Sequence, residues 1–338
     1  MRCKVSKHKH FAAFLLCLLL FMFSGCINTP PEKSLRFFSM DTLIQFKAYG
    51  DCEEALKNAR ERVEYLDSIL DATDKDSVVS CLRDGQSLPQ DLLIPLRAAK
   101  KIAAQTDGAL DLTLYPLSDA WGFFSKNYSV PSAEKIEQLL ANKGSWSLNS
   151  DLFHCAPQTK LDFGSVAKGY AATQAANILR EYGVTSAVLT LGGNVQTIGL
   201  KPNGSPWVVS VTDPADSQGI IGNLHLNNEA AVTSGNYQRN FMRNGKLYHH
   251  ILDPKTGCPA ESGLISVTIV CTDSTTADGL STAIFIIGKE NALKLYKSKT
   301  FDFEMLLVTE KNEIFITEGL ADRFEQTNQN YKQPQVLR

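Results

Sequence analysis

The sequence lacks several features that would place it in common classes of protein. Its net charge is −2 over 338 residues, and Lys and Arg do not cluster beyond the first ten positions. Because nucleic-acid phosphates are neutralised by clustered cations, this pattern argues against nucleic acid as a partner. No Cys-x-x-Cys pair occurs, which argues against a zinc ribbon or a thioredoxin-type site. The Walker A spacing and internal repeats are also missing.

The N-terminal residues have the pattern of a lipoprotein signal peptide. Several basic residues precede the apolar run 11–23, which is too short to span a bilayer as an ordinary helix. The run leads into the string FSGC, which resembles a bacterial lipobox although Phe23 stands where Leu is usual. We therefore expect a signal peptide over residues 1–25 and an extracytoplasmic lipoprotein anchored to the cell membrane through lipidated Cys26. An ordinary signal peptide that contains a Cys is the alternative.

The rest of the chain is expected to form one domain between two polar segments. Residues 26–36 contain Pro-Pro and should form a tether, residues 37–325 the domain, and residues 326–338 a polar tail that frays. Hydrophobic residues make up 43% of the chain, so a packed core is expected. Of the eight cysteines, those beyond Cys26 should mostly be buried small hydrophobes, and an extracytoplasmic location would allow one disulfide.

Helical and strand-like patterns are mixed along the chain without regular alternation. Apolar spacing predicts helices at residues 51–70, 94–104, 164–182 and 277–287. Short apolar or alternating runs predict strands at residues 37–49, 187–191, 207–211, 263–270 and 303–309. We therefore predict an α+β fold with mixed, largely antiparallel sheets and packed helices, rather than a doubly wound one.

Two glycine-containing motifs are suited to approaching a ligand closely. Residues 161–170 read LDFGSVAKGY, in which a Gly-containing turn opens a helix. Such a turn offers backbone N–H groups and a positive dipole end to an anion, and Lys168 adds a cation suited to phosphate. Residues 189–194 read LTLGGN, where paired glycines follow a strand. Taken alone, the first motif also fits a plain helix start and the second a plain tight turn.

Two further motifs carry candidate catalytic and metal-binding groups. Residues 249–257 read HHILDPKTG, and adjacent histidines on a strand point in different directions, so they do not readily bind one ion. The nearby Asp253 could orient or charge an imidazole, or the histidines could be turn residues. On a helix, Asp278 and Thr282 share one face and form a pair of hard oxygen donors that suits Mg²⁺. A plain helix start is again the alternative.

In this order, the four motifs resemble the ApbE family of FAD:protein FMN transferases, once described as thiamine-biosynthesis lipoproteins. The strings MDT at residues 40–42 and TDGALD at residues 106–111 add to the resemblance, which runs from about Phe38 to Phe324. It implies an ApbE-like, T-fold-related architecture. It also implies FAD as substrate, Mg²⁺ as cofactor, and transfer of FMN to a Thr or Ser hydroxyl of target proteins with release of AMP.

The resemblance also implies roles for the residues that match the family's motifs. His250 falls at the catalytic position. Contacts with FAD are implied at Met40, Ala72, Thr73, Asp111, Lys168 and Leu252. Magnesium ligands are implied at the main-chain carbonyl of Ser165 and at the side chains of Asp278 and Thr282. Asp41 stands where the family usually has Gly, beside the flavin contact at Met40, and Ser165 stands where Gly or Ala is usual.

The family's acceptors carry a Ser/Thr-Gly-Ala-Thr-like motif, and this chain lacks it, so the chain is not expected to be its own substrate. Acceptors of the implied kind are subunits of membrane redox pumps or other extracytoplasmic flavoproteins. Three alternatives remain open at this point. They are an FAD pyrophosphatase that yields FMN and AMP, a non-catalytic flavin-binding lipoprotein, and a solute-binding lipoprotein of a transporter. The last would need two α/β lobes, and the chain lacks regular alternation.

Overall fold

The structure is a computed structural model, and it describes residues 29–338. The expected signal peptide, residues 1–25, and the expected lipidation site, Cys26, lie outside the described residues. No helix within residues 29–338 combines the length and the apolar character needed to cross a membrane. Residues 32–338 form one compact unit that contains all the elements below.

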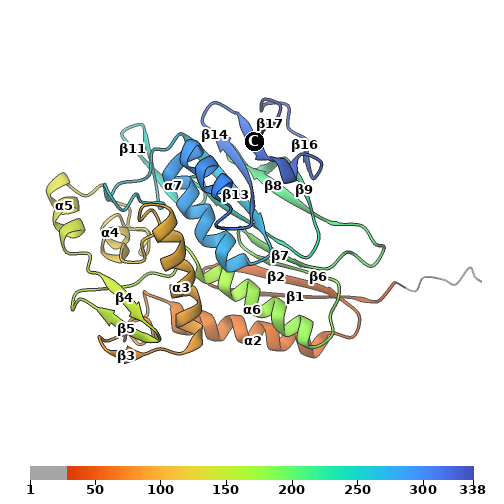
Figure 1. Ribbon diagram of the computed structural model, residues 1–338, viewed down its shortest axis with the longest axis horizontal. Coiled ribbons are helices and arrows are strands. Elements are labelled where there is room, and N and C mark those ends of the chain that lie inside the picture. Colours follow the sequence, from red (N-terminus) through yellow and green to blue (C-terminus); the bar gives the residue numbers. More distant parts are fainter. Residues whose placement is uncertain (1–28) are drawn as a thin grey trace, which may run out of the picture. The chain divides into compact units, whose positions relative to one another are not determined.

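A nine-stranded sheet forms the centre of this unit, with the order β1-β2-β6-β7-β10-β13-β14-β15-β17 (Figure 1). Neighbouring strands are antiparallel except for the β15–β17 pair. The strands are β1 (Glu32–Ser39), β2 (Thr42–Tyr49), β6 (Ala187–Leu191), β7 (Asn194–Ile198), β10 (Ala230–Gly235), β13 (Leu264–Cys271), β14 (Glu304–Thr309), β15 (Ile314–Thr317) and β17 (Gln335–Leu337).

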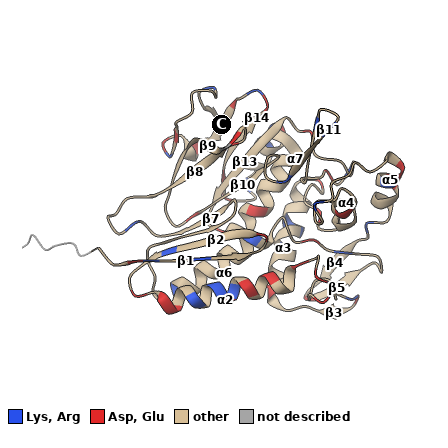
Figure 2. Cartoon of the chain, turned by 180° about the vertical axis from the view of Figure 1, so that it is seen from behind, with Lys and Arg blue, Asp and Glu red and all other residues tan. Residues whose placement is uncertain are grey.

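Helices cover one face of this sheet. The helices are α2 (Glu53–Leu70), α3 (Gln90–Gln105), α6 (Ala167–Glu181) and α7 (Ser274–Ser298). Helices α2, α6 and α7 contact the sheet, and α3 packs on α7 (Figure 1). The Ala-rich face of α6 is buried, which allows α2 and α7 to approach it closely on both sides. The outward face of α2 carries charges of both signs, paired four residues apart at Lys57–Glu61 and Arg60–Glu64 (Figure 2).

A second, three-stranded sheet with the order β16-β9-β8 covers part of the opposite face. Its strands are β8 (Trp207–Asp213), β9 (Asp216–Leu226) and β16 (Phe324–Gln326). Apolar side chains of β8 and β9, such as Val211 and Leu224, form a core cluster with Val270 and Leu306 of the large sheet. The two sheets are therefore held together by a separate apolar layer, as in a sheet-on-sheet packing.

The remaining elements form a peripheral part beside α3. They are β3 (Gln86–Ser87), α4 (Tyr115–Ala120), α5 (Ala133–Ala141), β4 (Trp146–Asn149), β5 (Leu152–Cys155), β11 (Asn240–Arg243) and β12 (Lys246–His249). The 3₁₀ turn η1 (Glu318–Leu320) instead packs on β14. Trp121 lies at the centre of an aromatic cluster with Phe123, Phe241 and Tyr248. Its indole N–H donates to the carbonyl of Gly257, 2.9 Å away. This bond ties the β12-proximal segment 250–260 to α4.

The α+β prediction is confirmed, and three predicted helices and most predicted strands lie within one to four residues of the observed ones. The helix predicted at residues 277–287 covers only the first part of α7, which continues to Ser298 beyond a kink at Gly288. The segment 37–49 differs, because it is a hairpin and not one strand. Its two-residue turn has Met40 at φ 52° and Asp41 at φ 58°. Left-handed backbone at both positions is typical of a type I′ turn, but Met gives no sequence signal for it.

Both polar ends of the predicted domain are more ordered than expected. Residues 32–36, expected in the tether, form the first half of β1, which pairs with β2 through its main chain. In the expected frayed tail, β17 pairs with β15 and Tyr331 is buried against Asp213. Main-chain pairing needs no apolar side chains, so composition alone does not reveal such strands.

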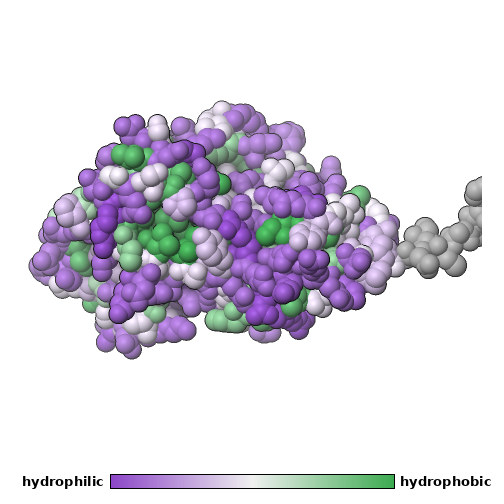
Figure 3. Space-filling model, turned by 90° about the horizontal axis from the view of Figure 1, so that it is seen from below, coloured by the Kyte–Doolittle hydropathy of each residue, from purple (hydrophilic) through white to green (hydrophobic). Residues whose placement is uncertain are grey.

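The five cysteines within residues 29–338 are all free, so the disulfide that we considered does not form there. Cys52 and Cys271 are buried, Cys155 and Cys258 are half-buried and Cys81 is exposed, so the prediction that most of them are buried is wrong. Apolar surface on the face shown in Figure 3 is divided into separate patches by hydrophilic residues. Phe38 and Leu43, which face each other across the β1–β2 hairpin, are among the most exposed large apolar side chains.

Candidate active site

The site begins at the N-terminus of α6. The Asp162 carboxylate accepts the N–H of Gly164 at 2.8 Å, which fixes the turn that precedes the helix. Lys168 follows in the first helical turn, and its Nζ donates to the Gly164 carbonyl at 3.5 Å. The side chain is half-buried and makes no ion pair with any residue of the described part of the chain. A cation without a partner at a helix N-terminus is well placed for a phosphate.

Helix α7 meets this helix start at Gly169. The Gly169 N–H donates to Asp278 Oδ2 at 2.8 Å, and Asp278 is 4% exposed. A Cβ at Gly169 would lie 2.2 Å from the Ser274 carbonyl oxygen and 2.6 Å from Asp278 Cβ. The close approach of α6 and α7, and with it the position of the Asp278 carboxylate, therefore depends on glycine at this position.

Replacing Gly169 with Ala should lower the free energy of unfolding by about 1–3 kcal/mol, because backbone must move to admit the methyl group. The same shift should displace the Asp278 carboxylate. Urea denaturation measures the first effect. Asn177→Ala, at an exposed position of the same helix, is the control and should change stability by less than about 0.5 kcal/mol. Equal stability of the two variants would contradict the proposed tight contact.

The donors at Asp278 fit a magnesium ion that shares its coordination with a substrate. Burial raises the pKa of Asp278, while the charge of Lys168 and the Gly169 N–H lower it. Thr282 lies one turn further along α7, with Oγ1 3.3 Å from Ser234 Oγ. No cluster of three or more His, Cys, Asp or Glu side chains in residues 29–338 could enclose a metal alone. One carboxylate and one hydroxyl suit Mg²⁺, which commonly takes further ligands from water and substrate phosphates.

The two adjacent histidines point apart, as predicted. His249, the last residue of β12, is buried, with Nε2 3.2 Å from the Ala260 carbonyl and its ring 5.5 Å from that of Phe285. The ring nitrogen Nδ1 of His250 instead lies 3.2 Å from the Arg239 carbonyl oxygen. The main-chain N–H of His250 donates to the same oxygen at 3.1 Å. A carbonyl only accepts, so Nδ1 carries the proton and Nε2 is the free basic nitrogen.

Asp253 does not orient His250, contrary to one of our interpretations of the sequence. Its carboxylate accepts the Lys255 N–H at 2.8 Å within the turn that follows. The tight Asp-Pro-Lys-Thr-Gly turn uses the side chain locally, which is the usual behaviour of Asp in turns. The main-chain carbonyl of Arg239 takes the orienting role.

Two cations act on His250 and on Asp162. Burial lowers the pKa of His250 to about 3, and the positive charges of Arg239, His249 and Lys168 act in the same direction. Part of the His250 side chain nevertheless remains exposed to solvent. Burial raises the pKa of Asp162, and the charges of Lys168 and Arg239 oppose this shift. Lys168 also acts on Asp278. The predicted residues Lys168, Asp278 and His250 therefore share one electrostatic environment, in which the imidazole is neutral at physiological pH.

The Met40 and Ala72–Thr73 segments lie in turns anchored by carboxylates of α2 and its C-terminal end. Asp67 Oδ2 accepts the Met40 N–H at 2.8 Å, which holds the β1–β2 turn against α2. Asp71 Oδ1 accepts the N–H and the hydroxyl of Thr73 at 2.8 and 2.7 Å. Asp71 also raises the pKa of Asp162, after larger effects, so this turn lies near the start of α6.

Two further expected flavin contacts, Asp111 and Leu252, already interact with other residues of the protein. Asp111 accepts hydrogen bonds from Thr113 and forms an ion pair with Lys143. A ligand at this carboxylate would therefore share it with Lys143. Leu252 is buried in the cluster around Trp121, so a contact with flavin there would use its main chain.

Sequence reasoning missed Arg239 and Asp67 and gave Asp162 no role of its own. Asp162 stands inside the LDFGSVAKGY motif, where its position before a Gly turn was a usable signal. Arg239 and Asp67 carry no such signal, because their contacts join segments distant in sequence.

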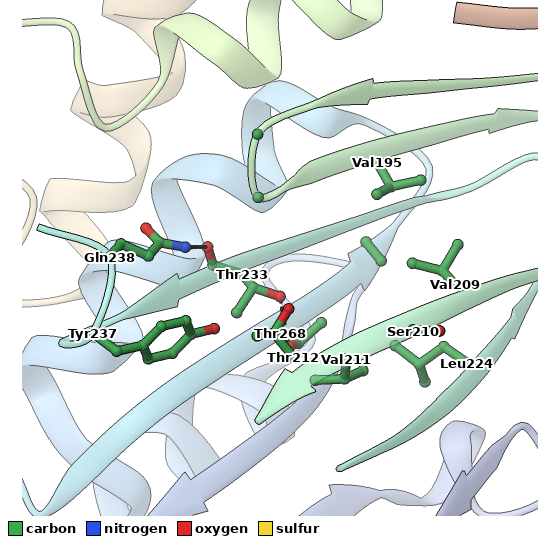
Figure 4. A pocket seen from close by; sticks show the side chains of 13 residues that line it. Val195, Val209, Ser210, Val211, Thr212, Leu224, Thr233, Tyr237, Gln238 and Thr268 are labelled. Atoms are coloured by element: carbon green, nitrogen blue, oxygen red, sulfur yellow. Dashed lines mark hydrogen bonds between the residues drawn. The ribbon is translucent and has the colours of Figure 1, made fainter. Parts of the chain in front are cut away.

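A cavity of about 240 Å³ lies beside the site, between the two sheets (Figure 4). Gln238, the residue before Arg239, lines it, and its Nε2 donates to the Thr233 carbonyl at 3.0 Å. The hydroxyls of Thr233 and Thr268 are 2.8 Å apart on its wall. Its remaining lining includes the Gly192–Gly193 turn of the LTLGGN motif, and a Cβ at Gly193 would lie 3.0 Å from Gln238 Nε2.

Comparisons with known proteins match this chain to one family. The profile of the ApbE family matches residues 40–307. An FAD:protein FMN transferase from Klebsiella pneumoniae (strain 342) is 34% identical over 70% of this chain and 75% of its own length. One from Escherichia coli (strain K12) is 28% identical over 90% of this chain and 93% of its own.

Solved structures show the same fold. The ApbE protein of Thermotoga maritima aligns with a TM-score of 0.80 and 31% identity, covering 88% of this chain and all of that one. The Pseudomonas stutzeri flavinyl transferase ApbE, in its apo form, aligns with a TM-score of 0.73 and 31% identity. That alignment covers 83% of this chain and 92% of the other. The expected ApbE-like architecture is therefore confirmed.

Proposed function

The chain belongs to the ApbE family, and from this premise we propose that it transfers FMN from FAD to a Thr or Ser hydroxyl of other proteins, with release of AMP. The observation that carries the proposal is the meeting of α6 and α7 through the Gly169 N–H and Asp278, which places Lys168 beside this carboxylate and near His250. A free cation, a buried carboxylate and a neutral imidazole provide phosphate binding, metal binding and proton transfer at one place.

Each of these residues has a distinct task in the proposed reaction. Lys168 and the N–H groups at the start of α6 bind the pyrophosphate of FAD. Asp278, Thr282 and the carbonyl of Ser165 would hold Mg²⁺, which would compensate the charge of the departing AMP. His250 accepts the acceptor's hydroxyl proton at Nε2 while the oxygen attacks the FMN phosphorus. The bond from this phosphorus to the AMP oxygen breaks, and FMN stays attached to the acceptor as a phosphoester.

The flavin would lie along the turns that hold Met40, Ala72 and Thr73, with Asp111 and Leu252 as further contacts. Met40 and Thr73 are fixed through Asp67 and Asp71, so this edge is organised before the ligand arrives. Preorganisation of this kind lowers the entropic cost of binding.

Quantifying AMP and free FMN with and without an acceptor tests this proposal. The purified protein is incubated with FAD and Mg²⁺, alone or with a peptide that carries Ser/Thr-Gly-Ala-Thr. We expect AMP to form only with the peptide and free FMN to stay low. Equal amounts of AMP and FMN without the peptide would identify a pyrophosphatase, in which water takes the place of the hydroxyl. Bound FAD without any AMP would indicate flavin binding alone.

We further propose that the mature protein is a lipoprotein attached to the cell membrane at Cys26, outside the cytoplasm. The FSGC string and the short apolar run before it support this. Its acceptors would then be extracytoplasmic, such as subunits of membrane redox pumps. Cys26→Ser should move the protein from the membrane fraction to the soluble fraction, as fractionation and immunoblotting would show. Cys52→Ser, at a buried cysteine, is the control; unchanged membrane attachment of Cys26→Ser would refute lipidation.

A further inference from the structure

An ion pair joins the β1–β2 turn to the loop that holds the imidazole. Arg239 Nη2 lies 3.4 Å from Asp41 Oδ2, and the two side chains are 44% and 80% exposed. A long, exposed pair of this kind contributes little to stability. Asp41 nevertheless occupies a left-handed conformation, φ 58°, in a turn that Asp67 fixes through the neighbouring Met40. The turn thus holds the Asp41 carboxylate in place beside a guanidinium that it binds only weakly, so a ligand anion could displace it.

Arg239 also stands beside the groups that the transfer reaction would use. Its carbonyl holds His250, and its charge acts on His250 and Asp162. Lys168 acts on the same two residues from the α6 side. Arg239 and Lys168 thus both lie near the imidazole of His250. Within residues 29–338, the only ion pair formed by either cation is that of Arg239 with Asp41. Both cations therefore lie where a phosphate beside His250 could reach them.

We infer that Arg239 is a second phosphate-binding residue of this site, and that Asp41 is an internal competitor that holds its guanidinium until the phosphates of FAD arrive. The planar guanidinium of Arg can donate two parallel hydrogen bonds to one phosphate. The single contact with the exposed Asp41 carboxylate, at 3.4 Å, is weaker than such a pair of bonds. The competitor sits next to Met40, on the edge where the flavin is proposed to bind. The inference rests on the proposed function, since it takes FAD as the ligand.

Affinities for FAD and riboflavin, measured by titration of flavin fluorescence, test the inference. Arg239→Gln should weaken FAD binding by about tenfold, the scale of a lost charge-assisted hydrogen bond. Asp41→Asn should tighten it by about two- to fivefold, the range of an exposed ion pair. Asn tolerates the left-handed backbone, so this change removes charge and keeps the turn. Riboflavin has no phosphate, and its affinity should not change.

The double variant provides the sharpest comparison. In the Arg239→Gln background, Asp41→Asn should have no effect, because no guanidinium remains to be released. Arg239→Lys should recover part of the affinity. Arg243→Gln, at an exposed position in β11, is the control and should leave FAD affinity unchanged.

Opposite results have distinct meanings. Asp41→Asn with unchanged or weaker FAD binding would overturn the inference, as would equal shifts for riboflavin. A tightened affinity is a gain that misfolding does not produce. If the parental protein binds no FAD, the proposed function fails as well. If it binds FAD and transfers FMN while both single variants behave as the parent, the inference alone fails.

Discussion

Replacing Asp278 with Asn should reduce turnover by at least about a hundredfold to a thousandfold, the scale of losing a preorganised electrostatic group. The Asn side chain keeps an oxygen for the Gly169 N–H, so α6 and α7 stay together while the charge that would hold Mg²⁺ is lost. Because burial raises the pKa of Asp278, the fold loses little when this charge is removed. Initial rates of FMN transfer over a range of Mg²⁺ concentrations measure the effect.

The matched control lies in the same helix. Asp273 caps α7 through the N–H groups of Thr275 and Thr276 and also accepts the hydroxyl of Thr173 in α6. Asp273→Ala should cost about 1 kcal/mol of stability and leave the rate of the folded protein near the parental value. Thermal unfolding with FAD and Mg²⁺ adds a second readout, since a ligand that binds only the folded protein raises the melting temperature more when it binds more tightly. Near-parental turnover of Asp278→Asn at limiting Mg²⁺ would refute the metal assignment.

Replacing His250 with Ala should lower the rate of transfer by roughly 10²–10⁴-fold and leave FAD affinity within about twofold. The reason is that the proton on the acceptor hydroxyl moves only during reaction, whereas the FAD phosphates carry their charge beforehand. Lys168→Ala should therefore behave differently and weaken both FAD binding and rate. Single-turnover transfer and FAD titration separate the two variants.

His249 serves as the control for His250, because the two residues are adjacent and their environments differ. His249 is buried against Phe285, so His249→Ala should lower the melting temperature and spare the chemistry of the folded protein. If His250→Ala instead damages stability, affinity and rate together, His250 is structural. If it transfers FMN at the parental rate with saturating acceptor, another group is the base.

The sequence predicted the elements whose side chains show a clear period. The buried face of α2, for example, repeats from Ala55 to Leu70 at helical spacing. The β1–β2 turn was missed because Met adopts left-handed backbone only rarely and gives no signal for a type I′ turn. The strand β17 was missed because its pairing with β15 depends on main-chain groups. Both features depend on contacts between distant segments, which a local sequence pattern does not predict.

In the candidate site, too, local spacing predicted some features, while others depend on how distant segments pack. Asp278 and Thr282 could be paired from sequence, because four positions on a helix define a shared face. Their meeting with Gly169 depends on how α6 and α7 pack, and no spacing predicts it. Likewise the sequence showed that His249 and His250 diverge, but the partner of His250 proved to be the carbonyl of Arg239 and not the Asp253 carboxylate.

The intact mass of an acceptor peptide tests the central claim most directly. The protein is incubated with FAD, Mg²⁺ and a peptide that carries the Ser/Thr-Gly-Ala-Thr motif, beside a matched peptide whose final Thr is Ala. We expect the first peptide to gain the mass of FMN less one water, with one AMP released per peptide, and the second to remain unmodified. An unmodified first peptide in the presence of bound, intact FAD would contradict the assignment of this protein as a flavin transferase.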